Sequence, residues 1–129
     1  MDKEEKGIKN KRELGTKYEK TAMEYLQTKG VHILQSNYRN RYGEIDIIAL
    51  DGDTLCFVEV KYRKTGKAGT SEESVGYAKQ KQICKISDFY RMQNQIPFHT
   101  PIRFDVIAVN DDRIRWMKNA FDYCGNSYF

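Results

Sequence analysis

The fold of this chain is decided by residues 43–61, which read GEIDIIALDGDTLCFVEVK. Two runs of β-branched, aliphatic and aromatic residues flank the dipeptide Asp51-Gly52, which tolerates the positive φ angles of a tight turn. The segment therefore predicts a β-hairpin with a two-residue loop at Asp51-Gly52. Both strands are apolar on both faces, as expected of strands covered by helices above and below. In the first strand, Ile45 and Ile47 should lie on one side and Ile48 on the other.

Three charged residues interrupt these apolar strands, namely Asp46, Glu59 and Lys61. A charge on a buried strand is costly unless it pairs, binds a metal or takes part in chemistry. The predicted loop would set Asp46 opposite Phe57, with Glu59 as its diagonal neighbour. Because residues two apart on a strand point the same way, we expect the three charges on one face.

Composition and length limit the class of protein. The chain has 129 residues, with 40% hydrophobic and 31% charged residues, which indicates one globular domain. The net charge of +4 is compatible with a polyanionic partner but does not require one. No apolar run approaches the roughly 18 residues of a membrane span, and the first residues do not resemble a signal peptide. The three cysteines are far apart in the sequence, so we expect reduced thiols and a cytoplasmic protein without a membrane partner.

A first helix is predicted over residues 13–29, ended by Gly30, after a flexible N-terminus of residues 1–13. Its buried stripe consists of Leu14, Tyr18, Ala22, Tyr25 and Leu26. At about 100° per residue, Glu19 falls on the margin of this stripe.

Further elements follow from periodicity and turn residues. The predicted segments are a short strand at 31–34, a polar connection at 35–42, a helix at about 71–95 with Val75, Ala78, Ile83, Ile86 and Tyr90 inward, strands at 103–109 and 113–117, and an irregular or weakly helical tail.

Two segments are candidates for nucleic-acid contact. In residues 38–42, arginines alternate with tyrosines, a pattern that suits phosphate contact and base stacking. An equally weighted alternative is a polar connection whose long side chains cover apolar surface. Residues 62–70 form a basic, glycine-containing loop that is attractive to phosphate. Contacts are assigned to Arg39, Arg41, Arg63, Lys64, Lys67, Lys79 and Gln80.

The carboxylates of Asp46 and Glu59 offer hard oxygen ligands that suit Mg²⁺ or Mn²⁺ better than zinc. The carbonyl of Val60 could complete the coordination, and Lys61 could orient a water molecule or stabilise charge on a phosphate. This division of roles is what hydrolysis of a phosphodiester requires. Glu-x-Lys on a strand is also common as an ion pair at an exposed edge, and that alternative stays open.

Several motifs together resemble the YraN-like bacterial proteins, a widespread uncharacterised family. The core motifs are Gly43-Glu44-Ile45-Asp46 and Phe57-Val58-Glu59-Val60-Lys61 with Arg63. The first helix contributes Gly15, Glu19, Ala22, Leu26 and Gly30, and the segment before the hairpin contributes Asn37 with Arg39. The later motifs are Lys79-Gln80, Arg103-Phe104-Asp105-Val106, and Trp116 with Asn119-Ala120-Phe121. The family resembles the restriction-endonuclease-like superfamily and, within it, the archaeal Holliday-junction resolvases.

The resemblance implies roles for four residues. Asp46, Glu59 and Lys61 would bind Mg²⁺ and activate water, and Glu19 on the first helix would assist. Tyr18 stands where we expect a small residue, so its ring could crowd the site.

We therefore expect a single-domain α/β protein of restriction-endonuclease-like type, with a mixed central β-sheet flanked by helices. Its domain should span residues 14–121, followed by a C-terminal tail at 122–129. The first functional hypothesis is a metal-dependent DNA endonuclease, structure-selective on branched DNA, and dimerisation would suit the cutting of two strands. The alternatives are a non-catalytic nucleic-acid-binding protein that retains the fold, and a scaffold whose buried charges are structural.

Overall fold

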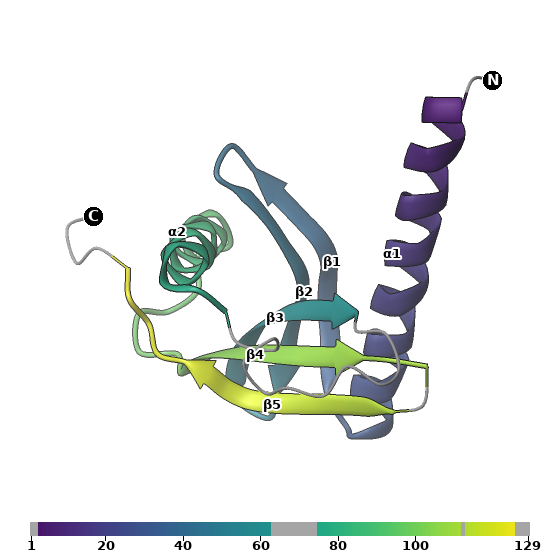
Figure 1. Cartoon of the computed structure of the whole chain (residues 1–129). Coiled ribbons are helices and arrows are strands. Elements are labelled where there is room, and N and C mark those ends of the chain that lie inside the picture. The colour runs from purple at the N-terminus through teal and green to yellow at the C-terminus, as the bar shows by residue number, and fades with distance from the viewer. Residues whose placement is uncertain (1–2, 63–74, 112, 126–129) are drawn as a thin grey trace.

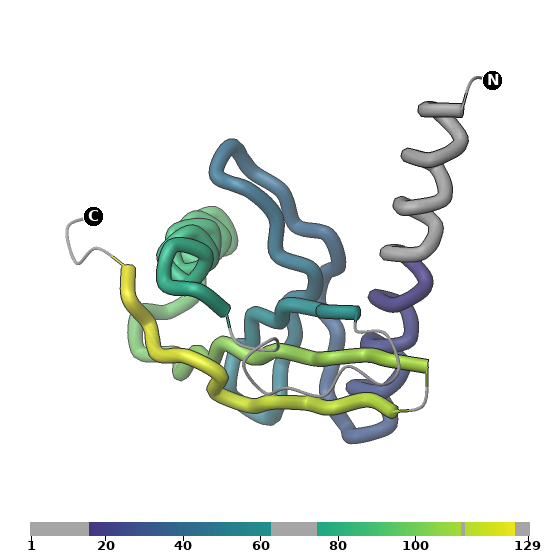
Figure 2. Tube along the Cα trace, in the orientation of Figure 1, coloured from purple at the N-terminus to yellow at the C-terminus, as the bar shows by residue number. Residues whose placement is uncertain are grey.

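The computed structural model describes residues 3–62, 75–111 and 113–125, of which residues 3–15 are described by their backbone alone (Figures 1 and 2). In chain order the elements are α1 (Lys3–Thr28), β1 (His32–Asn40), β2 (Gly43–Asp51), β3 (Thr54–Tyr62), α2 (Tyr77–Gln93), β4 (Ile102–Val109) and β5 (Ile114–Phe121). Within these residues, no helix is long and apolar enough to cross a membrane.

The five strands form one sheet in the order β1-β2-β3-β4-β5. Neighbouring strands are antiparallel except for β3 and β4, which run parallel and are joined through α2. A parallel connection needs such a crossover, whereas antiparallel neighbours need only a turn. The predicted single-domain α/β architecture, with a mixed sheet flanked by helices, is therefore confirmed.

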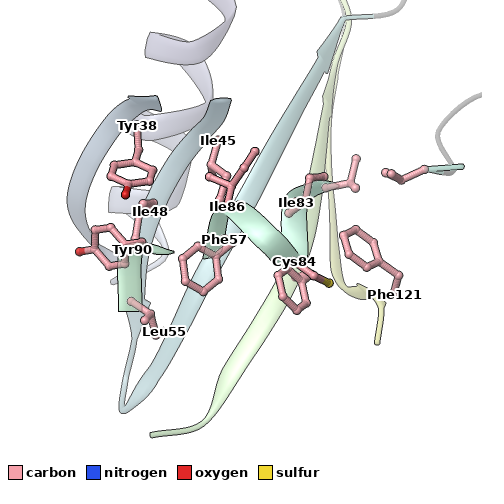
Figure 3. Packing of buried hydrophobic residues seen from close by; sticks show 13 residues of the cluster. Tyr38, Ile45, Ile48, Leu55, Phe57, Ile83, Cys84, Ile86, Tyr90 and Phe121 are labelled. Carbon is pink, nitrogen blue, oxygen red and sulfur yellow. The ribbon is translucent and has the colours of Figure 1, made fainter. Parts of the chain in front are cut away.

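Each helix covers its own face of the sheet. On the α2 face, Ile86 and Tyr90 pack with Ile48 and Phe57 of the strands (Figure 3). On the α1 face, Ala22 and Leu26 pack with the sheet residues Ile47, Ala49, Cys56, Val58, Ile107 and Val109. The two apolar clusters explain why the central strands are apolar on both sides.

The hairpin forms, but its turn lies one residue later than predicted. Asp51 pairs with Thr54, so the loop consists of Gly52 and Asp53, with Gly52 at φ +61°. Both candidate loops contain Gly52, and the observed one places the glycine first. The register differs by two residues from the predicted one, because Ile48, and not Asp46, opposes Phe57. A slip of two residues by itself changes no face. The prediction that Ile45 shares a face with Ile47 is nevertheless wrong, because Ile45 packs with Ile48 under α2 and Ile47 packs under α1.

Four other boundaries differ from the predictions. α1 begins at Lys3 and not at residue 13, although it ends as expected just before Gly30, at φ +82°. β1 continues through residues 35–40, which were predicted to be a connection, because they pair with β2 as far as Asn40. β5 extends to Phe121, into the predicted tail. α2 ends at Gln93, and Ala78 on its first turn is exposed and not inward.

Edge strand β5 is held to β4 by a buried carboxylate. Asp105 is only 1% exposed. Its oxygens accept hydrogen bonds from Arg103 Nε at 2.9 Å, Trp116 Nε1 at 2.9 Å and the backbone N–H of Asn119 at 2.9 Å. Arg103 also donates to Asp51 Oδ2 at 2.8 Å, which connects the hairpin turn to β4. These partners compensate a charge that would otherwise destabilise the core.

The three cysteines are free thiols. Sγ atoms of Cys84 on α2 and Cys124 after β5 lie 3.5 Å apart, although 40 positions separate them in the sequence. Burial raises the pKa of the Cys84 thiol to about 12.

Candidate metal and catalytic site

The site lies where β2 separates from β3. Their recorded pairing ends at Ile47 opposite Val58, whereas β2 stays paired with β1 as far as Gly43 opposite Asn40. Figure 1 shows that the turn between β1 and β2, with the strand ends beside it, lies away from β3. Asp46 is therefore the first residue of β2 beyond the paired segment.

Asp46 takes over the hydrogen bond that the separating strand leaves unmade. The backbone N–H of Val60 donates to Asp46 Oδ2 at 2.8 Å. A half-buried N–H needs such an acceptor once its neighbouring strand has gone. The side chain of Asp46 is thereby fixed against β3, next to Glu59. The carbonyl of Val60 as a metal ligand stays a prediction.

Three carboxylates converge here from two elements. One oxygen from each of Glu19, Glu44 and Asp46 lies within 4.8 Å of the other two. Glu19 comes from α1, and the side chain of Asn37 on β1 lowers the pKa of its carboxyl group. Glu44 and Asp46 are two apart on β2. Glu59 on β3 joins the group through Asp46, whose pKa its negative charge raises.

Burial and then mutual repulsion raise the pKa values of these carboxyl groups. Burial, assisted by repulsion from Glu59, raises the pKa of Asp46 to about 7, although the Val60 N–H lowers it. Burial followed by repulsion from Asp46 raises the pKa of Glu19. Burial also raises the pKa of Glu59. Such repulsion is what a bound divalent cation would relieve, so the donor set fits Mg²⁺ or Mn²⁺.

Two lysines face the carboxylates from different elements. Lys61 follows Glu59 by two residues on β3, and Lys79 lies on the first turn of α2. Burial raises the pKa of Glu59, whereas the positive charges of Lys79 and then Lys61 lower it. Lys79 also lowers the pKa of Asp46. Glu59 is therefore stabilised in its charged form by a lysine of α2 and by one of its own strand.

Tyr18 packs against Tyr62 at the end of β3. Their rings are stacked, with centroids 4.1 Å apart and planes 14° from parallel. A side-chain hydrogen bond with Tyr62 raises the pKa of Tyr18 to about 12. The pair joins α1 to β3, next in sequence to Glu19 and Lys61. That Tyr18 crowds the site stays a prediction.

The predicted nucleic-acid residues occupy different surroundings. Arg39 is exposed and pairs with Glu44, its cross-strand neighbour, with Nε 3.2 Å from the carboxylate. Arg41 lies in the β1–β2 turn over the ring of Tyr42. Gln80 Nε2 donates to the carbonyl of Val75 at 2.7 Å, at the start of α2. Arg63, Lys64 and Lys67 lie outside the described residues.

Glu44 and Asn37 belong to the motifs that carry the family resemblance, but neither was predicted to take part in the site. The spacing of Glu44 and Asp46 contained a signal, because residues two apart on a strand share a face. Asn37 has a positive φ of 55° within β1, which asparagine tolerates better than most residues. No periodicity reveals such a distortion, although an asparagine inside a strand is its usual sign.

Comparison with known proteins shows the family of the chain. The model of the uncharacterised protein family UPF0102 matches residues 18–109, which include every carboxylate of the site. The chain belongs to the UPF0102 family. A UPF0102 protein of Thermodesulfovibrio yellowstonii is 47% identical over 109 residues, covering 84% of this chain and 96% of the relative.

Other UPF0102 relatives are similar over nearly their whole length. One from Lachnoclostridium phytofermentans is 44% identical, covering 91% of this chain and 99% of the relative. One from Vibrio parahaemolyticus is 40% identical over 116 residues, covering 88% of this chain and 96% of the relative. The resemblance to YraN-like proteins drawn from the sequence is therefore confirmed.

Proposed function

We propose that this UPF0102 protein is a metal-dependent DNA endonuclease. The observation that carries the proposal is the convergence of Glu19, Glu44 and Asp46 within 4.8 Å, at the point where two strands separate. Structural ion pairs join opposite charges, whereas this group gathers like charges at a cost in stability. Such an arrangement is typical of a functional site.

The residues divide into three roles. Glu19, Glu44, Asp46 and Glu59 would hold Mg²⁺ or Mn²⁺, which when bound supplies Lewis-acid stabilisation of phosphate charge and a more acidic water. Lys61 would orient the water or stabilise the charge that develops on the phosphate. Lys79 would keep the carboxylates ionised and attract the substrate backbone.

A DNA substrate is supported by the cations around the acidic group. Arg39 at the end of β1 and Arg41 in the β1–β2 turn lie near Glu44 at the start of β2. Lys79 lies on α2 and lowers the pKa of Asp46. A strongly anionic polymer would otherwise be repelled by four carboxylates. The sheet-and-helix arrangement also agrees with a restriction-endonuclease-like nuclease, although fold alone does not determine activity.

The test is cleavage of a panel of duplex, nicked, single-stranded and branched DNA. We expect strand cleavage with Mg²⁺ or Mn²⁺, none with EDTA, and none from the Asp46→Asn variant under any condition. DNA binding without cleavage by the wild type would replace this proposal with a non-catalytic nucleic-acid-binding protein. Neither binding nor cleavage would leave a structural role for the buried charges.

A further inference from the structure

Exposed cations continue from the first turn of α2 to the β1–β2 turn. Lys81 and Lys85 lie on the outer side of α2, and Arg41 lies in the turn. Lys85 Nζ is 4.3 Å from the centre of the Tyr42 ring, and Arg41 Cζ is 5.0 Å from the same centre. We call Arg41, Lys81 and Lys85 the α2 basic surface. The ring of Tyr42 lies against two of these three cationic side chains, Arg41 and Lys85.

The turn is fixed to the helix by more than these rings. Gln82 Nε2 donates to the carbonyl of Tyr42 at 2.6 Å. Gly43 makes this approach feasible, because a Cβ there would lie 2.6 Å from Gln82 Nε2. The cations therefore project from a preformed surface, and binding would cost little ordering of the backbone.

The charges of this surface have aromatic partners and no acidic ones among the described residues. Lys81 Nζ lies 5.2 Å from the centre of the Tyr77 ring, and Tyr77 is 63% exposed. By contrast, Arg39 pairs with Glu44. Cations left without a carboxylate can exchange their counterions for phosphates, and an exposed ring beside them can stack on a base.

The surface adjoins the acidic group through both of its elements. Lys79, which faces Asp46 and Glu59, precedes Lys81 by two residues on α2. Tyr42 is followed directly by the β2 segment that carries Glu44 and Asp46. A polyanion bound along the α2 basic surface would therefore extend as far as the carboxylates of the acidic group.

We infer that the α2 basic surface binds the phosphate backbone of the DNA duplex on one side of the cleavage position. This inference rests on the proposed function, because the acidic group defines where cleavage occurs. Lys81 and Lys85 would bind DNA in addition to Arg41. The duplex would then run from the carboxylates across the outer side of α2.

The experiment measures fluorescence anisotropy of a labelled DNA duplex at several KCl concentrations. All proteins carry Asp46→Asn, which prevents cleavage and removes one repelling carboxylate. The test variant adds Arg41→Ala, Lys81→Ala and Lys85→Ala. A charge-matched control replaces three exposed lysines by alanine, namely Lys17 and Lys20 on α1 and Lys29 just after it. Thermal unfolding of each variant checks that these surface changes leave the fold intact.

The α2 variant should lose affinity by roughly tenfold per lost contact at ~0.1 M salt, and the slope of log K against log salt should flatten by roughly two to three units. The control should stay within about twofold of its parent. Replacing Lys81 and Lys85 by arginine should restore the slope, because phosphate contact needs charge and not a particular side chain.

The outcomes separate the inference from the proposed function. Equal losses in both alanine variants would mean general charge attraction and would overturn the inference. An unchanged affinity of the α2 variant, with metal-dependent cleavage by the wild type, would overturn the inference and leave the nuclease standing. A parent that binds no duplex, together with a wild type that cleaves no DNA, would overturn both.

Discussion

Ile45 and Ile47 lie two residues apart on β2, yet their side chains pack on opposite faces of the sheet. Ile45 belongs to the cluster under α2, where Figure 3 shows it beside Ile86, and Ile47 belongs to the cluster under α1. The strict alternation of a strand therefore breaks at Asp46, the residue between them. This break, together with the separation of β2 from β3, turns the carboxylate toward Val60 N–H and Glu19.

Replacing Asp46 should make the metal-free protein more stable at high pH. Its folded-state pKa of about 7 lies above the ordinary value near 3.9, so the native state retains a proton that the unfolded chain loses. Wild-type stability should accordingly fall as pH rises from about 4 through 7. Asp46→Asn removes this loss and should gain about 1–3 kcal/mol at pH 8, after allowance for solvent screening.

Urea unfolding at pH 5 and pH 8 checks this, with Asp53→Asn at the exposed turn as the control. The gain should be larger at pH 8 for Asp46→Asn and independent of pH for the control. A gain of equal size at both pH values would contradict the raised pKa of Asp46.

Metal binding should depend on Glu44 as well as on Asp46. Calorimetric titration with Mn²⁺ should show binding lost in Asp46→Asn and weakened roughly tenfold or more in Glu44→Gln, because each removes a charged oxygen donor. Glu24→Gln, an exposed change on α1, should bind like the wild type. Equal affinity of all four proteins would place the metal elsewhere.

Gly43 should tolerate alanine less well than Gly30. Both have positive φ angles, of 139° and 82°, but a Cβ at Gly43 would also meet Gln82 and Ile86, whereas at Gly30 it would meet nothing within 4 Å. Gly30→Ala should cost about 1 kcal/mol of unfolding free energy from backbone strain alone. Gly43→Ala should cost about 1–3 kcal/mol more, because packed side chains must move. Equal losses of unfolding free energy for the two variants, measured by urea unfolding, would show that Gln82 and Ile86 move aside without cost.

The Asp105 network should be the most sensitive polar contact of the core. Asp105→Ala leaves Arg103 and the indole N–H of Trp116 without their buried acceptor, so we expect a loss of about 3–5 kcal/mol in unfolding free energy. Asp122→Ala, an exposed carboxylate just after β5, should change it by less than about 0.5 kcal/mol. Similar values for the two variants would mean that packing alone holds β5 in place.

The sequence predicted β2, β3 and β4 well because these strands are apolar on both faces, and Gly52 marked the hairpin. It could not place the turn, because Asp51-Gly52 and Gly52-Asp53 are both acceptable loops around one glycine. Asp46, Glu59 and Lys61 stood out as charges on apolar strands. Glu44 was overlooked, although it lies two residues before Asp46. The break at Asp46 could not be predicted, because it depends on β2 leaving β3, and no local pattern encodes that separation.

The most direct test of a catalytic site at this break is the single-turnover cleavage rate of Lys61→Ala, measured beside its DNA affinity. If Lys61 orients water or stabilises phosphate charge, cleavage should fall by ~10² or more while affinity stays nearly unchanged, since one phosphate contact among several contributes little to binding. Thermal unfolding should show little change. Full cleavage activity in Lys61→Ala would contradict this account. A wild type that cleaves no DNA, together with a lowered melting temperature of Lys61→Ala, would also contradict it, because Lys61 would then be only the ion-pair partner of Glu59.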